Sequence, residues 1–159
     1  MDFSKLSPNH MIAGGGGLVS LINIFLPWYG VDFGFGQSLS FNAFDAGFFA
    51  WAGALLAVAA GVLVVLKAME IFEAKVGALT TEQFAMVLGA LGTVFILLKL
   101  LIDNDVTKFG IYLGLIAAAA TTAGAFLSAK DEGVGLPSAD DFKGGSGGDS
   151  AAGGGTSTF

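Results

Sequence analysis

The segment from Ser7 to Gly30 constrains the fold more than any other part of the chain. It reads SPNHMIAGGGGLVSLINIFLPWYG, and on a helical wheel it separates small and polar residues from large apolar ones. The small face holds Asn9, Ala13, Gly16, Ser20, Asn23 and Pro27, and the large face holds Met11, Leu18, Ile22, Phe25 and Leu26. A helix in water hides its large apolar side, whereas in lipid that side can face outwards while small residues let neighbouring backbones approach closely. The segment therefore predicts a membrane helix.

The composition agrees with this prediction. Hydrophobic residues make up 54% of the 159 residues and charged residues only 13%, whereas soluble domains carry about 25% charged residues. The net charge of -6 and the seven scattered lysines argue against nucleic acid as a partner, because nucleic acid is bound through clustered cations. Since the chain has no cysteine, disulfides and thiolate metal sites are excluded.

The apolar pattern predicts an all-α membrane protein, an up-down-up-down bundle of four transmembrane helices within residues 1–128. The expected spans are 8–28, 46–66, 81–102 and 108–128, and the second helix is expected to continue to residue 76. Residues 31–45 suit a short hairpin or an interfacial loop. Residues 129–159 are rich in Gly, Ser and Asp and predict a disordered tail.

Residues that favour particular helix starts precede three of the spans. Ser7 suits the N-cap of the first helix, and Asn42 or Asp45 suits that of the second. Thr80 and Gln83 form a capping-box pattern for the third helix.

Small residues recur at helical spacing in all four spans, which is typical of helices that pack closely in membranes. The residues expected to carry helix packing and assembly are Gly16, Ser20, Gly53, Ala57, Gly61, Gly110 and Gly114. Trp28 and Tyr29 follow the first span and are expected to anchor it at the membrane–water interface.

Asn23 and Lys99 are the polar residues that most need an explanation within the spans. Asn23 lies near a carbonyl that Pro27 leaves without its helical donor, so it suits either a hydrogen bond between helices or an ion or substrate site. Lys99 suits a snorkelling side chain that reaches headgroups or a nearby carboxylate such as Asp103, or a residue of a transport cavity.

The remaining motifs favour structural roles. Gly14–Gly17 is followed by Leu18 and Val19, not by the Lys and Ser or Thr that a phosphate-binding loop requires. His10 is expected at the surface, without the neighbouring ligands of a metal site. Lys67 and Glu70 are spaced for local pairing on a solvated face. The sequence therefore predicts no catalytic residue, no cofactor site and no metal site.

The distribution of lysine predicts the orientation. Five lysines fall on one side of the expected membrane and two on the other, which favours a multi-pass protein of the cell membrane with both termini in the cytoplasm. The first group is Lys5, Lys67, Lys75, Lys130 and Lys143, and the second is Lys99 and Lys108.

The run GGGGLVSLINIFLPWYGV, followed by FNAFDAGFFAWAGALLAVAAGVLVVL, resembles a pattern in uncharacterised four-span actinobacterial membrane proteins. These proteins similarly end their first span in Leu-Pro-Trp-Tyr or a related sequence. The resemblance covers about residues 11–66 and implies four spans and a location in the cell envelope. It brings no active residue with it.

These observations predict a non-enzymatic accessory, scaffold or assembly subunit that lies in the lipid bilayer and binds other membrane proteins or copies of itself. The alternative is an oligomeric transporter or channel for small solutes or ions, lined by Asn23, Ser20, Thr121 and Lys99. An enzyme that acts on lipid is a third interpretation.

Overall fold

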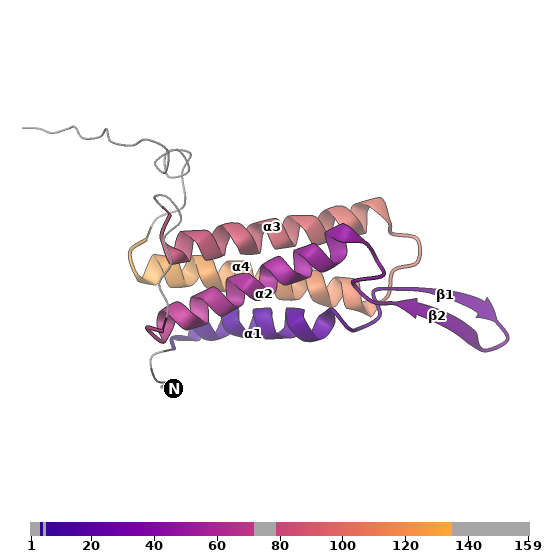
Figure 1. Cartoon of the computed structure of the whole chain (residues 1–159), viewed down its shortest axis with the longest axis horizontal. Coiled ribbons are helices and arrows are strands. Elements are labelled where there is room, and N and C mark those ends of the chain that lie inside the picture. Colours follow the sequence, from indigo (N-terminus) through magenta and orange to yellow (C-terminus); the bar gives the residue numbers. More distant parts are fainter. Residues whose placement is uncertain (1–3, 5, 72–78, 135–159) are drawn as a thin grey trace, which may run out of the picture.

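The computed structural model describes residues 4, 6–71 and 79–134. Four helices form a bundle, and a two-stranded hairpin extends beyond one of its ends (Figure 1). The elements are α1 (Pro8–Asn23), β1 (Tyr29–Gly34), β2 (Gln37–Phe41), α2 (Phe48–Ala68), α3 (Thr81–Ile102) and α4 (Phe109–Asp131). Three of the helices, α2, α3 and α4, are long and apolar enough to cross a membrane. The chain is therefore mostly helical, but the hairpin makes it more than an all-α protein.

Side-chain caps start two of the helices, as predicted. Ser7 accepts from the backbone amide of His10 at the start of α1, and Thr80 forms a reciprocal capping box with Gln83 at the start of α3. The prediction for the second helix was wrong. Asn42 instead accepts from the amides of the two residues at 44 and 45, and α2 begins only after Gly47, whose φ is 109°.

Two helices end earlier than the sequence predicts. The α1 helix stops at Asn23 and not at residue 28, because Pro27 has no amide hydrogen to continue the helical hydrogen bonds. The α2 helix stops at Ala68 and not at residue 76, because Glu70 adopts a left-handed conformation and the amide of Ile71 bonds back to the carbonyl of Leu66. Because a glutamate and not a glycine takes this conformation, the helix end was not predictable from the sequence.

The predicted boundary between bundle and tail also shifts. The α4 helix continues to Asp131, beyond the expected end at residue 128. The rest of the predicted tail, residues 135–159, lies outside the described residues, as do residues 72–76 of the expected extension of the second helix.

The helices pack with their small faces inwards, as predicted. α1 contacts α2 and α4, and α3 contacts the same two helices from the other side. On α1 the buried residues are Ala13, Gly16, Gly17, Ser20 and Asn23, whereas Met11, Leu18 and Ile22 are more than half exposed. The α4 stripe from Gly110 to Ser128 is buried in the same way. This distribution suits lipid outside and close backbone contact inside.

The hairpin confirms the strand interpretation of residues 31–45 and begins two residues earlier, at Tyr29. Its strands are antiparallel and place Tyr29 opposite Phe41 and Val31 opposite Leu39. Its base is fixed to the loop before α4, because the Gly30 amide donates to the carbonyl of residue 106 at 3.1 Å. We call this end of the bundle the hairpin end, and the opposite end, near the N-terminus, the N-terminal end (Figure 1).

Candidate functional site

Glycines bring α1 and α4 into backbone contact. A Cβ atom on Gly16 would lie 2.4 Å from the Thr121 hydroxyl oxygen and 2.7 Å from the Ala117 carbonyl oxygen. A Cβ on Gly110 would lie 2.4 Å from the Pro27 carbonyl oxygen. Because these distances are too short for a Cβ contact, a side chain at either position would force the facing atoms to move. Ser20 lies in the same seam and is 1% exposed.

The contacts of α2 are equally close. A Cβ on Gly61 would lie 2.7 Å from the Ala13 carbonyl oxygen of α1, and one on Gly53 would lie 2.9 Å from the Gly92 carbonyl oxygen of α3. Ala57 is fully buried between them. All seven residues predicted for packing and assembly therefore pack inside one chain. They are not available at the surface to bind a partner.

Trp28 closes the core at the hairpin end and does not face the membrane interface as predicted. Its side chain has no exposed surface, and Tyr29 is only 7% exposed. The amide of Trp28 donates to the Phe41 carbonyl, and the Trp28 carbonyl accepts from the Lys108 amide. These bonds draw the chain across the end of the bundle after Pro27, so the indole packs inwards.

Asn23 has an unexpected environment. Its carbonyl, predicted to lack a donor, accepts from the Trp28 indole N–H at 2.8 Å and from the Leu26 amide at 3.1 Å. Its side-chain oxygen and nitrogen are buried and have no hydrogen-bond partner among the described residues, and the same holds for the Ser20 hydroxyl. A Cβ on Gly114 would lie 2.5 Å from the Asn23 amide nitrogen, which shows how tightly the side chain is enclosed.

A row of aromatic rings surrounds part of the bundle near the hairpin end. Phe25 lies 6.3 Å from Phe44, and Phe44 lies 6.4 Å from Trp51. Phe48 then links Trp51 to Phe95 of α3, at 5.4 and 6.1 Å between ring centroids. Since Phe25, Phe44 and Phe48 are about half exposed or more, this row takes the outer position that the sequence had suggested for Trp28 and Tyr29.

Lys99 lies near the hairpin end, and its side chain reaches Asp103, one of the carboxylates that the sequence suggested. Its ammonium forms an ion pair with Asp103 and lies 5.2 Å from the centre of the Tyr29 ring. The Tyr29 hydroxyl donates to the Lys99 carbonyl at 3.5 Å. Burial, together with the nearby Asp103 carboxylate and Tyr112, raises the pKa of Tyr29 to about 12.

A polar pocket opens beside this ion pair. It has a volume of about 330 Å³, and we call it the acidic pocket. Its lining is Tyr29, Phe41, Asp45, Ala46, Lys99, Asp103, Asp105 and Val106. Three carboxylates and one ammonium therefore face it, and Tyr29 and Phe41 connect it to the base of the hairpin.

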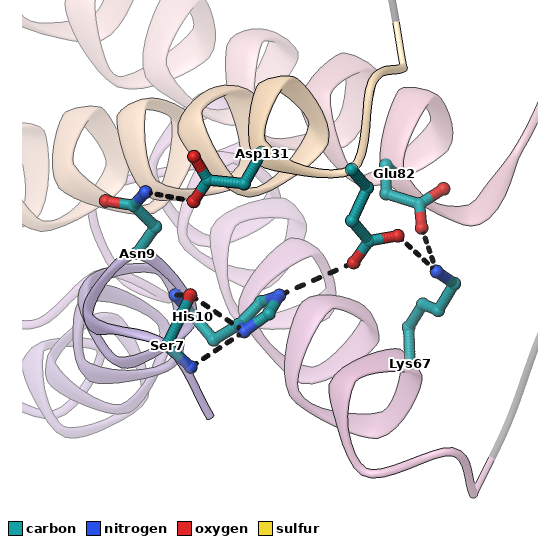
Figure 2. A network of polar contacts seen from close by, with 7 residues as sticks. Ser7, Asn9, His10, Lys67, Glu82 and Asp131 are labelled. Carbon is teal, nitrogen blue, oxygen red and sulfur yellow. Dashed lines mark hydrogen bonds and ion pairs between the residues drawn. The ribbon is translucent and has the colours of Figure 1, made fainter. Parts of the chain in front are cut away.

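A network of polar side chains joins the helices at the N-terminal end (Figure 2). Lys67 of α2 bonds to Glu82 of α3 and, at 2.5 Å, to Glu132 after α4. Glu132 also lies 3.7 Å from the His10 ring. Lys67 thus makes contacts between helices, whereas the sequence predicted a local one. No local pattern predicts this network, because residues bonded in it lie up to 122 positions apart in the chain.

The same network holds the start of α1. His10 bonds back to Ser7, and its side chain is 12% exposed, so it is less open to solvent than predicted. Asn9 donates to Asp131 at 2.6 Å (Figure 2). Within residues 6–71 and 79–134, no group of three or more His, Cys, Asp or Glu side chains is arranged to hold a metal ion.

Comparison of the chain with protein families, with curated proteins and with solved structures finds no match. The functional inferences below therefore depend on the sequence and the geometry of this chain.

Proposed function

We propose that the protein is a four-span cell-membrane protein that acts as a non-enzymatic scaffold or accessory subunit. One observation carries the proposal: the hairpin projects from the bundle with an apolar face that the described residues leave uncovered. Val31, Phe33 and Leu39 are 37%, 59% and 55% exposed, and Phe35 at the turn is fully exposed. Contiguous exposed apolar surface is typical of a binding site for another molecule.

The backbone of the hairpin turn supports a binding role. Phe35 has a φ of 53° between two glycines that also have positive φ. A bulky residue in this region is strained, and such strain occurs most often at functional positions. The turn thus holds an aromatic ring in solvent although glycine, which has no Cβ atom, would relieve the strain.

The four-span topology is part of the proposal. The α1 helix has 16 residues, or about 24 Å at 1.5 Å per residue, which is short for a hydrocarbon core of about 30 Å. The half-exposed Phe25 extends the apolar surface beyond its end. Contacts with α2 and α4 along its small face support a position beside them in the bilayer.

Lysine positions support an orientation with the hairpin outside the cytoplasm. Lys99 and Lys108 lie at the hairpin end, and Lys67 and Lys130 lie at the N-terminal end. The sequence predicts Lys5, Lys75 and Lys143 on the same side as Lys67 and Lys130, which makes five lysines against two. In a Phe35→Cys variant, which has a single cysteine, a membrane-impermeant maleimide added to intact cells is expected to label residue 35. Labelling only after lysis would contradict this orientation.

The proposal is tested by native purification in mild detergent and mass spectrometry of the proteins that co-purify. We expect a stoichiometric membrane partner with the wild type, and its loss in Phe33→Ala/Phe35→Ala. The matched control is Leu18→Ala/Ile22→Ala, which removes two apolar side chains that are more than half exposed from the outer face of α1. Recovery of the wild type as a bare monomer would contradict a scaffold function.

A second candidate function, transport by an oligomer, is favoured by the buried Asn23 amide and Ser20 hydroxyl, which lack partners among the described residues. Buried polar groups in membrane helices often mark a path for ions or solutes. Selective flux into proteoliposomes that is lost in Asn23→Leu would support this function. Equal flux in the two proteins, or none, would count against it.

A further inference from the structure

The hairpin has two chemically different faces. The pairs Tyr29–Phe41 and Val31–Leu39 lie on one face, and Gly30–Ser40 and Asp32–Ser38 lie on the other, because paired residues in antiparallel strands point to the same side. The apolar face is buried at Tyr29 and becomes exposed towards the turn. At its base it runs into the acidic pocket, since Tyr29 and Phe41 line both.

The charge at the hairpin end is negative. The ionised groups described there are the carboxylates of Asp32, Asp45, Asp103 and Asp105 and the ammonium groups of Lys99 and Lys108. Both ammonium groups already contact carboxylates, Lys99 with Asp103 and Lys108 with Asp32 at 3.7 Å. The surface therefore favours a cationic partner.

The negative charge at the hairpin end favours some binding partners for the apolar face of the hairpin over others. Anionic lipid headgroups and nucleic acid would be repelled by the excess of carboxylates. A second copy of this chain would present the same excess, with its lysines at this end already paired. The bilayer that surrounds the helices would not cover the hairpin, because the hairpin extends beyond the end of the bundle (Figure 1).

The free edge of the hairpin favours a polypeptide over a small cationic molecule. Among the described residues β2 pairs only with β1, so one edge of β2 keeps backbone donors and acceptors available. The sequence of β2, QSLSF, contains no charge and no proline that would block an added strand. Extended peptides bind such edges through main-chain hydrogen bonds and place alternate side chains on one face.

We infer that the hairpin and the acidic pocket together bind an extended segment of another protein, with apolar residues at alternate positions and Lys or Arg at one end. The apolar residues lie over Val31 and Leu39, and the cationic end lies against Asp45 and Asp105. The inference rests on the proposed scaffold function, since it specifies the chemistry of the partner.

The test uses the full chain in phosphatidylcholine nanodiscs, whose zwitterionic lipid does not attract cations. The probe is a fluorescein-labelled peptide Ser-Val-Ser-Val-Ser-Lys-Lys, together with its reversed sequence, and binding is measured by fluorescence anisotropy. One control peptide replaces Lys by Glu, and another replaces Val by Ser. We expect at least one Lys probe to bind, both controls to bind about tenfold more weakly or not at all, and added salt to weaken binding.

Protein variants test the site itself. Asp45→Asn/Asp105→Asn removes the unpaired pocket charges, and Val31→Ser/Leu39→Ser removes the apolar face; each is expected to weaken binding by about tenfold. The charge control is Asp131→Asn at the opposite end, which is expected to bind as the wild type does. Unchanged thermal midpoints in detergent show that the variants remain folded.

Several results would overturn the inference: no binding of either Lys probe, equal binding of the Glu peptide, or full binding by both hairpin-end variants. Self-association lost in Val31→Ser/Leu39→Ser, with no probe bound, would identify a second copy as the occupant and would also overturn it. If a partner co-purifies but the probes do not bind, the scaffold function stands and only this inference fails. If the probes bind but no partner co-purifies, the scaffold function fails.

Discussion

The packing of α1 against α4 can be tested with the same substitution, glycine to alanine, at the adjacent positions Gly15 and Gly16. A Cβ on Gly16 would lie 2.4 Å from the Thr121 hydroxyl, 2.7 Å from the Ala117 carbonyl and 2.8 Å from the Thr121 amide, whereas a Cβ on Gly15 would have nothing within 4 Å. Two of the three close atoms belong to the backbone of α4, so α4 itself must move. Overpacking of this kind costs about 1–3 kcal/mol.

Gly15→Ala is the matched control for Gly16→Ala, because it adds the same methyl group without the steric clash. Gly15→Ala and Gly16→Ala change helix propensity and unfolded-chain entropy alike. The difference between their free energies of unfolding therefore measures the steric cost at the contact of α1 with α4. We expect Gly16→Ala to be less stable than Gly15→Ala by about 1–3 kcal/mol, as measured by denaturation with sodium dodecyl sulfate in mixed micelles. Equal stability of the two variants would refute the packing of α1 against α4.

Three further predictions concern the two ends of the bundle. Trp28→Phe removes one of the two donors to the buried Asn23 carbonyl and should lower the free energy of unfolding by about 0.5–1.5 kcal/mol; an unchanged thermal midpoint would contradict that hydrogen bond. In a Tyr112→Phe background, phenolate absorbance should show Tyr29 titrating well above its ordinary pKa of 10.0 and towards about 12. Because the folded state holds this proton to higher pH than the unfolded chain, the free energy of unfolding should fall as the pH rises from 10.0 to about 12; titration near 10.0 would show an exposed ring. Lys67→Met leaves two carboxylates without their ammonium group and should destabilise the protein by about 3 kcal/mol, whereas the exposed Lys130→Met should change stability by less than about 0.5 kcal/mol; similar values for both would argue against the network.

The inward and outward faces of the helices were predictable because they depend on local periodicity. Every residue of the predicted small stripe of α4, from Gly110 to Ser128, is buried, as are Gly16 and Ser20 of α1. Helix starts at Ser7 and Thr80 were also predictable, since a capping side chain bonds only three residues away. These features need no knowledge of the tertiary structure.

Features that join distant residues were not predictable in this way. The sequence placed Trp28 at the membrane interface, because an aromatic residue after an apolar span usually lies there. The structure buries it, because bonds to residues 41 and 108 fold the chain over the end of the bundle. Likewise, the bonds of Lys67 to Glu82 and Glu132 join residues of different helices, and no local spacing predicts them.

The sequence by itself determined the apolar character of the helices, their small-residue faces and the short hairpin, because each follows from the repeat of side chains along one element. Only the tertiary structure decided which small faces meet, that all of them are used within one chain, and that the hairpin's apolar face continues into a pocket of carboxylates. The physical reason is that contacts and pockets depend on the distances between elements, which no single segment of the chain specifies.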